Sequence, residues 1–599
     1  MQDMSIPKFP DLNLDDVQSD LNQEYASLES GYNNAKARRM EFAKRYRFEL
    51  YGNEVNGSSK YVDSTIFNAI EWMVPTFVQP FIEGQNLINI TPDGSDTKSL
   101  ISAQVHKELL HYQVRKKMDF YSFLYKLSKS FFIDGESYGK HVWIKADKSK
   151  NEPVSRNAIV NVLAPQIRYD WSALSLADSY VVTEDKDITK SEIVQMRGQS
   201  GVIDSQLDKV LEGNGRNEET TNLRDEKAEH PNHVGDNDSF RTDANKLFLR
   251  REHWTNYDVD GSGVAIPVLA IFINDVLVRF IKNPMALNKH PYFKAECVGD
   301  VQGNQGIGFA ELLAPIQAFK TGLFRMFSDN MNAQNNGLVE VDTNHVDDVG
   351  LMILQRAPAG TRTPIPSRKI GSIQPLPPTP IAGHSLNITE LLNVEAENRT
   401  GFTRYSQGLD SSSLNQTATG ISAIIQRSEM RMWELAVRFS ESFLEPVVRD
   451  MIAMNQKHLT PQELEVQFGI PAFSAGGQEH PERASGDWIN VSKEDLGGYF
   501  SVDIDLETPT QKEKKTQDMT AWAQYFGPMM PPELVQEIAL ISANQIGLKE
   551  IENLLRRTNK NAFGSRGVLQ TAFGGGAEQG GQGPQAGPVP QAPIQPDGI

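Results

Sequence analysis

Apolar residues recur every three or four positions along several long stretches of the chain, which is the spacing of a helix with one buried face. The clearest stretch is 309–335, where the recurring residues are Leu312, Leu313, Ile316, Phe319, Leu323, Phe324, Phe327 and Met331. A further helix is predicted over 387–404. The longest predicted helix, 417–457, would extend ~60 Å at the usual rise per residue, and Pro446 should bend it.

Helices and strands both occur in the first half of the chain. The helical spacing predicts helices over 12–50, 63–80 and 100–132. Runs rich in β-branched and aromatic residues predict strands over 140–145, 159–163, 179–183, 246–254, 264–273 and 276–281. We expect the helices to be interrupted around Gly31, Pro75 and Pro80. This half is therefore predicted to be a mixed α+β unit, with a polar surface insert over 197–239.

Smaller features lie between and after the long helices. Residues 338–380 predict a compact module of one strand, one short helix and a Pro/Gly-rich run. A polar loop over 405–416 follows. Beyond the long helix, strands are predicted near 464–468 and 499–506, and helices over 511–557. Residues 574–599 contain eight Gly, five Pro and no aromatic residue, so we expect the C-terminal tail to be disordered.

Composition excludes several classes of protein. The formal net charge of −18 argues against a surface that clamps nucleic acid through its phosphates. A single cysteine, Cys297, excludes a disulfide scaffold and fits a reducing cytoplasm. The longest apolar run is far shorter than the ~20 residues of a membrane helix, and the acidic N-terminus predicts no signal peptide.

Sequence motifs give no support for catalysis. The stretch Gly135-Glu-Ser-Tyr-Gly139-Lys140-His141 is one residue short of a phosphate-binding loop and favours a helix-to-strand turn. The glycines over 303–308 have the wrong spacing for dinucleotide binding and favour a flexible lead-in to the next helix. No zinc-protease or hydrolase motif occurs, and the eleven histidines are scattered. We therefore expect no catalytic residues, no metal site and no cofactor.

The second half of the predicted helix over 12–50 is basic. Its cations are Lys36, Arg38, Arg39, Lys44, Arg45 and Arg47. Such a face could contact nucleic acid or dock on an acidic neighbour, and we favour the second interpretation because the chain as a whole is acidic.

The order of helix, small module, helix, polar loop and long bent helix resembles the portal, or head-to-tail connector, protein of tailed bacteriophages. The residues that carry the resemblance are Gly306-Ile-Gly-Phe-Ala-Glu-Leu-Leu-Ala-Pro315, Thr400-Gly-Phe-Thr-Arg-Tyr-Ser-Gln-Gly-Leu-Asp410, Gln416-Thr-Ala-Thr-Gly420 and the stretch from Ser64 to Phe81. So many long apolar stripes are also difficult for one chain to cover, and repetition around a ring would bury them.

The resemblance implies a helix-rich α+β protomer with wing, stem, clip and crown, which assembles into a ring. The implied parts are an N-terminal helical arm over 1–58, the first part of the wing over 59–302, stem helices over 303–336 and 386–404, a clip over 337–385, a tunnel loop over 405–416, the long helix and second part of the wing over 417–510, a crown over 511–562 and a disordered tail over 563–599. The insert over 197–239 matches no part of the family.

The resemblance also implies which residues face DNA. The tunnel loop offers weak hydrogen bonding and no cation, through Asp410, Ser411, Ser412, Ser413, Asn415 and Gln416. On the first stem helix, Lys320 and Arg325 would line the pore or form ion pairs between subunits. In the clip, Arg362, Arg368 and Lys369 would contact DNA or the motor, or belong to a solvated loop.

The implied function is a dodecameric ring at one capsid vertex through which double-stranded DNA is packaged and ejected. The implied partners are the terminase large subunit, which supplies ATP hydrolysis, the major capsid and scaffolding proteins, and the head-completion, adaptor and tail proteins. The protein would be assembled in the host cytoplasm and would reside in the virion, without a membrane. Two alternatives stay open at this point: a metal-dependent nuclease with dispersed carboxylates, and another structural virion protein.

Overall fold

The structure is a computed structural model, and it describes part of the chain. The described residues are 13–83, 87–94, 97–146, 154–213, 242–299, 304–335, 339–356, 365, 368–369, 371–375, 384–401, 430–460 and 497–506. The chain divides into two compact units, Met1–Ala475 with Val491–Gln517 and Gly476–Asn490 with Asp518–Ile599, and every described residue belongs to the first. The predictions that lie outside the described residues are the loop 405–416, the first turns of the long helix, the strand 464–468, the helices over 511–557 and the tail.

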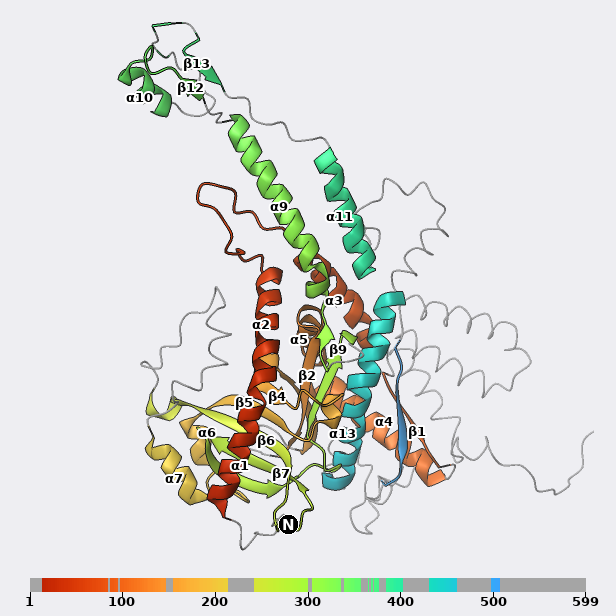
Figure 1. The fold of residues 1–599 in the computed structure, drawn as a ribbon. Helices are drawn as coiled ribbons and strands as arrows, with labels where there is room; N and C mark the ends of the chain where they lie inside the picture. The colour runs from red at the N-terminus through yellow and green to blue at the C-terminus, as the bar shows by residue number, and fades with distance from the viewer. Residues whose placement is uncertain are drawn as a thin grey trace, which may run out of the picture. The chain divides into compact units, whose positions relative to one another are not determined.

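The larger sheet has five antiparallel strands. Their order is β4 (Ile167–Tyr169), β5 (Val182–Thr189), β6 (Leu247–Tyr257), β7 (Ile266–Ile273) and β8 (Val276–Lys282) (Figure 1). The predicted strands over 246–254, 264–273 and 276–281 are confirmed. The strand predicted over 179–183 is wrong for most of its length, because the Ser179 hydroxyl bonds the Asp170 N–H and the Val181 carbonyl and so closes a turn before β5 begins.

Helix α1 (Leu14–Ser27) packs on one face of this sheet through apolar and charged contacts. Its Val17 and Leu21 belong to a small buried cluster with residues of β7 and β8. The Tyr25 hydroxyl donates a 2.5 Å hydrogen bond to Asp185, and the Arg251 guanidinium lies 3.4 Å from the centre of the Tyr25 ring. The sheet is thus joined to the N-terminal arm.

The helix predicted over 12–50 has one break, and it is not at Gly31. Helix α1 ends before Leu28, and α2 (Glu29–Tyr46) contains Gly31 in its first turn. Any Cβ at Gly31 would overlap the indole ring of Trp171, so this glycine serves packing between α2 and the segment after β4.

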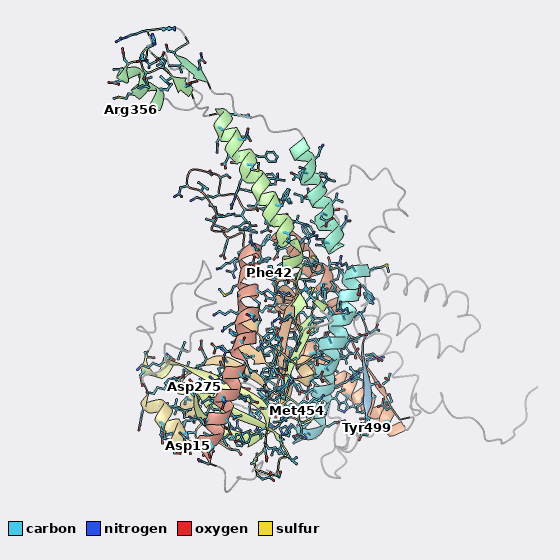
Figure 2. The ribbon with its side chains drawn as sticks, in the orientation of Figure 1. Asp15, Phe42, Asp275, Arg356, Met454 and Tyr499 are labelled. Carbon is cyan, nitrogen blue, oxygen red and sulfur yellow. The ribbon has the colours of Figure 1, made fainter. Side chains whose placement is uncertain are left out.

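The smaller sheet, in the order β3 (Arg156–Val162), β2 (Glu136–Ile144) and β9 (Tyr292–Glu296), shares a core with several helices. These helices are α3 (Thr65–Glu83), α5 (Phe120–Ile133), α9 (Phe309–Asn335) and the helical stretch 430–458. The rings of Phe77, Phe131, Phe132 and Phe439 meet at the centre of this core. A second cluster lies against the larger sheet, and Figure 2 labels one member of each, Phe42 and Met454.

Two helix predictions in this region need correction. The prolines at 75 and 80 do not interrupt α3, because burial of its apolar face against α5 and α9 outweighs the hydrogen bonds that the prolines remove. The helix predicted over 100–132 is two helices, α4 (Thr97–Lys117) and α5. Helix α4 packs on β1 (Ile88–Pro92), which pairs with β14 (Phe500–Ile504), the strand predicted over 499–506.

The helices around the small module agree closely with the sequence. The prediction for α9 is confirmed at both ends. Helix α11 (His384–Thr400) packs beside α9 and ends earlier than predicted, where Gly401 adopts φ 71° (Figure 1). The module contains β12 (Val339–Val341), α10 (Asp348–Arg356) and one strand that the sequence did not predict, β13 (Ile373–Pro375), which pairs with β12.

The long helix does contain an irregularity next to Pro446. Residues 430–439 are α-helical, Ser440–Leu444 form one π-helical turn, and α13 (Glu445–His458) continues from it. The N–H of Glu445 bonds the carbonyl of Ser440, five residues back. The irregularity is therefore a widened, π-helical turn, and it lies directly before Pro446, where a bend was expected.

The described part of the polar insert is folded. Residue Val202 forms a bridge with Arg279 of β8, and α7 (Asp204–Glu212) buries Leu207 and Val210 on the same strand. The short helix α6 (Lys190–Gln195) precedes it. Most of these residues lie at the surface, as expected, but Leu207 and Val210 pack on the sheet, an apolar pair that was hidden among polar neighbours.

A buried polar cluster ties the long helix to the smaller sheet. The two ring nitrogens of His141 lie 2.5 Å from an Asp450 carboxylate oxygen and 2.9 Å from the Asn157 amide oxygen. The Asn157 amide nitrogen donates to the Met451 carbonyl at 3.1 Å, which fixes the orientation of that amide. Both ring nitrogens of His141 therefore have polar partners inside the core, as buried polar groups require.

We expect the substitution Asp450→Ala to destabilise the chain by about 1–3 kcal/mol, because it leaves a buried ring nitrogen of His141 without its hydrogen-bond partner. Urea unfolding followed by circular dichroism measures this. The control is Arg449→Ala, which removes an exposed ion pair with Glu445 on the same helix and should cost about 1 kcal/mol or less. Equal losses for the two variants would contradict the role of the cluster.

Candidate functional site

Close backbone packing fixes the start of α9. Gly135, with φ 82°, makes the turn between α5 and β2, as the sequence favoured for this stretch. A Cβ on Gly135 would lie 2.5 Å from the Gly306 carbonyl oxygen, and one on Gly308 would lie 2.6 Å from the Ile133 carbonyl oxygen. The glycines before α9 are therefore not a flexible lead-in: they form β11 (Gly306–Ile307), which pairs with β10 (Val298–Gly299), and press against this turn.

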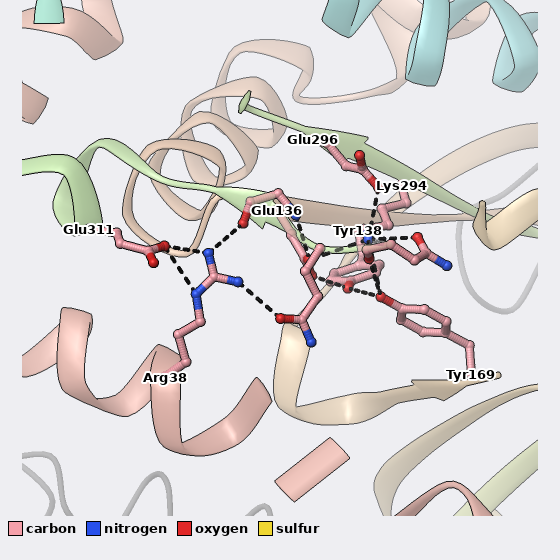
Figure 3. A network of polar contacts seen from close by, with 10 residues as sticks. Arg38, Glu136, Tyr138, Tyr169, Lys294, Glu296 and Glu311 are labelled. Atoms are coloured by element: carbon pink, nitrogen blue, oxygen red, sulfur yellow. Dashed lines mark hydrogen bonds and ion pairs between the residues drawn. The ribbon is translucent and has the colours of Figure 1, made fainter. Parts of the chain in front are cut away.

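A buried ion cluster lies beside this contact (Figure 3). The Lys294 ammonium lies 3.3 Å from Glu136 and 3.0 Å from Glu296, and it donates to the Tyr169 hydroxyl at 3.1 Å. The other end of the cluster is the Glu136 carboxylate, which accepts the Gly306 N–H at 3.0 Å. Burial alone would lower the pKa of Lys294, but the two carboxylates outweigh burial and raise it.

Arg38 connects α2 to the same point. Its guanidinium donates to Glu311 in the first turn of α9, to the Gln305 side chain at 3.0 Å and to the Gly306 carbonyl at 2.9 Å (Figure 3). This confirms for Arg38 that the basic face of α2 docks on an acidic neighbour. The neighbour belongs to the same chain.

Beyond its buried start, α9 is held by polar contacts with the end of α2, the segment that joins α2 to α3, and the start of α3. Gln317 donates to the Arg45 carbonyl at 2.9 Å and accepts the Ile66 N–H at 2.9 Å. Lys320 donates to the Thr65 hydroxyl at 2.7 Å and lies 3.6 Å from the Asp63 carboxylate. We refer to these contacts, together with those of Arg325 and Asp329 below, as the arm clamp.

Arg325 forms the outer part of the arm clamp. It donates to the Tyr61 carbonyl at 2.7 Å, to the Asn53 side chain at 3.0 Å and to the Glu54 carboxylate at 2.6 Å. One helical turn further, Asp329 accepts the Ser59 N–H at 2.6 Å. The segment therefore follows α9 for about three turns.

The two cations predicted on the first stem helix have partners within their own chain. Lys320 is 8% exposed and Arg325 has a side chain that is 13% exposed, and both pair with carboxylates of the same chain. Their roles toward a pore or between subunits stay predictions.

The clip candidates in the described part of the chain are exposed. Arg368 forms an ion pair of 3.0 Å with Asp347, and its side chain is 71% exposed. The hydrogen bond from His345, helped by the charge of nearby Lys369, lowers the pKa of Asp342. These groups agree with a solvated loop and leave a docking role open.

The remaining candidates lie outside the described residues: Arg362, Asp410, Ser411, Ser412, Ser413, Asn415 and Gln416. The residues that are described contain no group of three His, Cys, Asp or Glu placed to hold a metal ion. Among the described helices, none has the length and apolar character that crossing a membrane would require.

Large apolar side chains remain uncovered on both α9 and α11. On α9, Phe319 is 54% and Met326 is 69% exposed, and the seven-residue spacing places them on one face. On α11, Leu391 is 67% exposed and Val394 is 42% exposed. Helices of a monomeric protein rarely leave such neighbouring apolar faces to water.

The sequence matches the family model described as Phage SU10 portal protein over residues 17–164 and 150–597. The chain belongs to the Phage SU10 portal protein family. The resemblance drawn from the order of its helices is thus confirmed, and the function is that of a portal protein of a tailed phage, the head-to-tail connector through which DNA is packaged. The family is structural, and nothing supports the nuclease or the other virion protein as alternatives.

Sequence reasoning missed the carboxylates that hold this portal protein's stem, namely Glu54, Asp63 and Glu311. One signal was present: Gln317, Lys320 and Thr321 place polar groups at helical spacing on the face that is apolar one turn earlier. Polar residues on a buried helix face indicate polar partners. The pairs could not be read, because each carboxylate and its cationic partner lie more than two hundred residues apart in the sequence.

The arm clamp should be sensitive to acid through Glu54. Burial opposes ionisation of Glu54, but hydrogen bonds from the Tyr51 and Gly52 N–H groups and from Arg325 lower its pKa below the ordinary 4.5. A depressed carboxyl pKa stabilises the fold fully above 4.5 and loses that contribution as the pH falls below this value. We therefore expect Glu54→Gln to lower the melting temperature at pH 7 and to have much less effect near pH 3.

The comparison for this experiment is Glu41→Gln, which removes an exposed carboxylate of α2 with a 3.5 Å contact to Arg45. Melting temperatures of wild type and both variants, measured across the pH range, test the prediction. A loss for Glu54→Gln that is independent of pH would contradict it.

Proposed function

We propose that twelve copies of this portal protein form a closed ring at one capsid vertex, with α9 and α11 of adjacent subunits packed side by side. The observation that carries the proposal is the exposed apolar faces of these two helices. Burying a large apolar side chain contributes roughly 1.5–3 kcal/mol. Repetition around a ring covers every such face, whereas a single subunit leaves all of them in water.

The arm clamp supports this arrangement. Ring closure needs the same angle between stem and wing in every subunit, since small errors accumulate around a circle. Contacts from Arg38, Gln317, Lys320 and Arg325 join α9 to the arm at four levels. A stem held in this way presents its apolar face in one orientation.

Within the ring, we propose that the loop 405–416 surrounds the DNA and that its polar residues contact it weakly. A polyanion that must slide is best surrounded by groups that hydrogen-bond without fixed cations, since each phosphate contact adds a salt-dependent barrier. The net charge of −18 per subunit is consistent with such a channel. Of the two cations on α9, Arg325 lies nearer to the proposed clip than Lys320 does, and it is paired with Glu54 of its own chain.

We propose further that the clip, 337–385, docks the terminase large subunit during packaging and the adaptor and tail proteins afterwards. ATP hydrolysis then belongs to the terminase. Arg362, Arg368 and Lys369 are the proposed contacts. Assembly with the major capsid and scaffolding proteins takes place in the host cytoplasm, with the wing and the proposed crown, 511–562, inside the capsid.

The double substitution Phe319→Asp and Leu391→Asp should abolish the ring and leave the subunit folded, because it places charges on both proposed contact faces. Native mass spectrometry and axial electron micrographs should show rings of about twelve for wild type and monomers for the variant. The control is Asn332→Asp, which adds the same charge to an exposed polar position on α9. Rings formed by the double variant would refute this contact.

Deletion of residues 411–415 should leave the ring intact and change DNA packaging or genome retention. This loop is not part of the proposed contact between stem helices. DNA content of purified particles measures the effect, and electron microscopy verifies the ring. Normal packaging by the deletion variant would exclude the loop as the DNA-facing element.

A further inference from the structure

A cavity of about 860 Å³ opens between the two sheets, next to the end of α13. Its charged lining comes from one face of the larger sheet, where β5 contributes Glu184 and Lys186, β6 contributes Arg250 and Glu252, and β8 contributes Arg279. The smaller sheet adds Lys140 from β2 and, just after the end of that strand, Lys145. A cavity of this volume is in the range of small-molecule sites.

The two carboxylates of the cavity have their counter-ions within the chain. Glu184 and Glu252 lie directly opposite each other on β5 and β6, an unfavourable pair if left alone. Lys140 bridges them, bonding Glu184 and lying 2.7 Å from Glu252, and Arg250 also pairs with Glu252. Burial would raise the pKa of Glu252, but these two cations outweigh it and lower that pKa to about 2.

The cations of the cavity are not balanced in this way. Lys186 and Arg250 are also directly opposite each other, two residues along the same strands from the glutamates and on the same face of the sheet. Lys145, Lys186 and Arg279 make no ion pair within the described part of the chain. The cavity lining therefore carries five cations against two carboxylates, in a chain whose formal net charge is −18. Outside the lining, the charges of Lys186 and Arg250 help to lower the pKa of Glu192.

One nitrogen in each of two guanidinium groups also lacks an acceptor. The Nε atoms of Arg250 and Arg279 are buried and have no hydrogen-bond partner among the described residues. An unpaired buried donor costs roughly 1–3 kcal/mol, so two of them in one cationic cavity indicate an acceptor that the described residues do not supply. Burial also lowers the pKa of Arg279.

We propose that this cavity binds a phosphate group, held by Arg279, Lys186 and Lys145. The planar fork of a guanidinium matches two oxygens of a tetrahedral oxyanion, and lysines add point charge. A doubly charged phosphate compensates three excess cations better than a single carboxylate does. The group comes from inorganic phosphate or from a small phosphorylated molecule such as a mononucleotide. This site is separate from the stem and does not depend on the ring contact.

Calorimetric titration of the full-length protein with inorganic phosphate, at low and constant ionic strength, tests the proposal. We expect binding to wild type, at least tenfold weaker binding to Arg279→Gln, and unchanged binding to Lys282→Gln, which removes an exposed cation of the same strand outside the cavity. Titration with adenosine monophosphate identifies the source: equal affinity indicates inorganic phosphate, and tighter binding indicates a nucleotide.

A second variant keeps the test independent of folding defects. The substitution Lys186→Gln removes the repulsion between Lys186 and Arg250, which face each other on β5 and β6. Without phosphate, the melting temperature of this variant should therefore equal or exceed that of wild type. Added phosphate should raise the melting temperature of wild type and leave that of the variant unchanged. Equal stabilisation of wild type, Lys186→Gln and Arg279→Gln by phosphate would overturn the proposal, as would binding of a pentaglutamate peptide without binding of phosphate.

Discussion

The contact between two glycine-containing segments determines where α9 begins. Gly135 and Gly308 bring the backbone after α5 against the backbone before α9 at distances that no side chain permits. Because the carbonyls and N–H groups of these segments are then fixed, Glu136 can accept the Gly306 N–H and Arg38 can reach the Gly306 carbonyl. The ion cluster and the docking of α2 both depend on this approach.

The start of α9 lies in the shared core, its middle is held by the arm clamp, and apolar side chains remain exposed on its other face. This order explains why one helix carries three kinds of residue. Leu313 and Ile316 are buried by the core, Gln317 and Lys320 by polar partners, and Phe319 remains open. A pattern that mixes these classes would be puzzling in a monomer, whereas it agrees with a subunit of a larger assembly.

Local pattern predicted local structure well in this chain. The ends of α9 and most strands of the larger sheet were found because periodicity and turn residues act over a few neighbours. The features that were missed depend on distant parts of the chain: β13 needs β12, the tolerance of α3 for its prolines needs α5 and α9, and the role of Gly31 needs Trp171. Lys320 was identified as a notable cation from its place on the predicted helix 309–335, but its partner Asp63 could not be seen.

In this protein, polar contacts fix the orientation of elements within the subunit, whereas the exposed apolar residues are available for association. Buried hydrogen bonds and ion pairs contribute modest net stability, since desolvation offsets much of their energy, but they are directional and tolerate little displacement. Apolar contacts are stronger per area and tolerate many angles. The portal protein uses directional contacts inside the subunit, at Arg38 and Arg325, and leaves large apolar residues uncovered on α9 and α11. This division sets the geometry before association and leaves the hydrophobic effect to drive it, which is what closure of a ring from identical subunits requires.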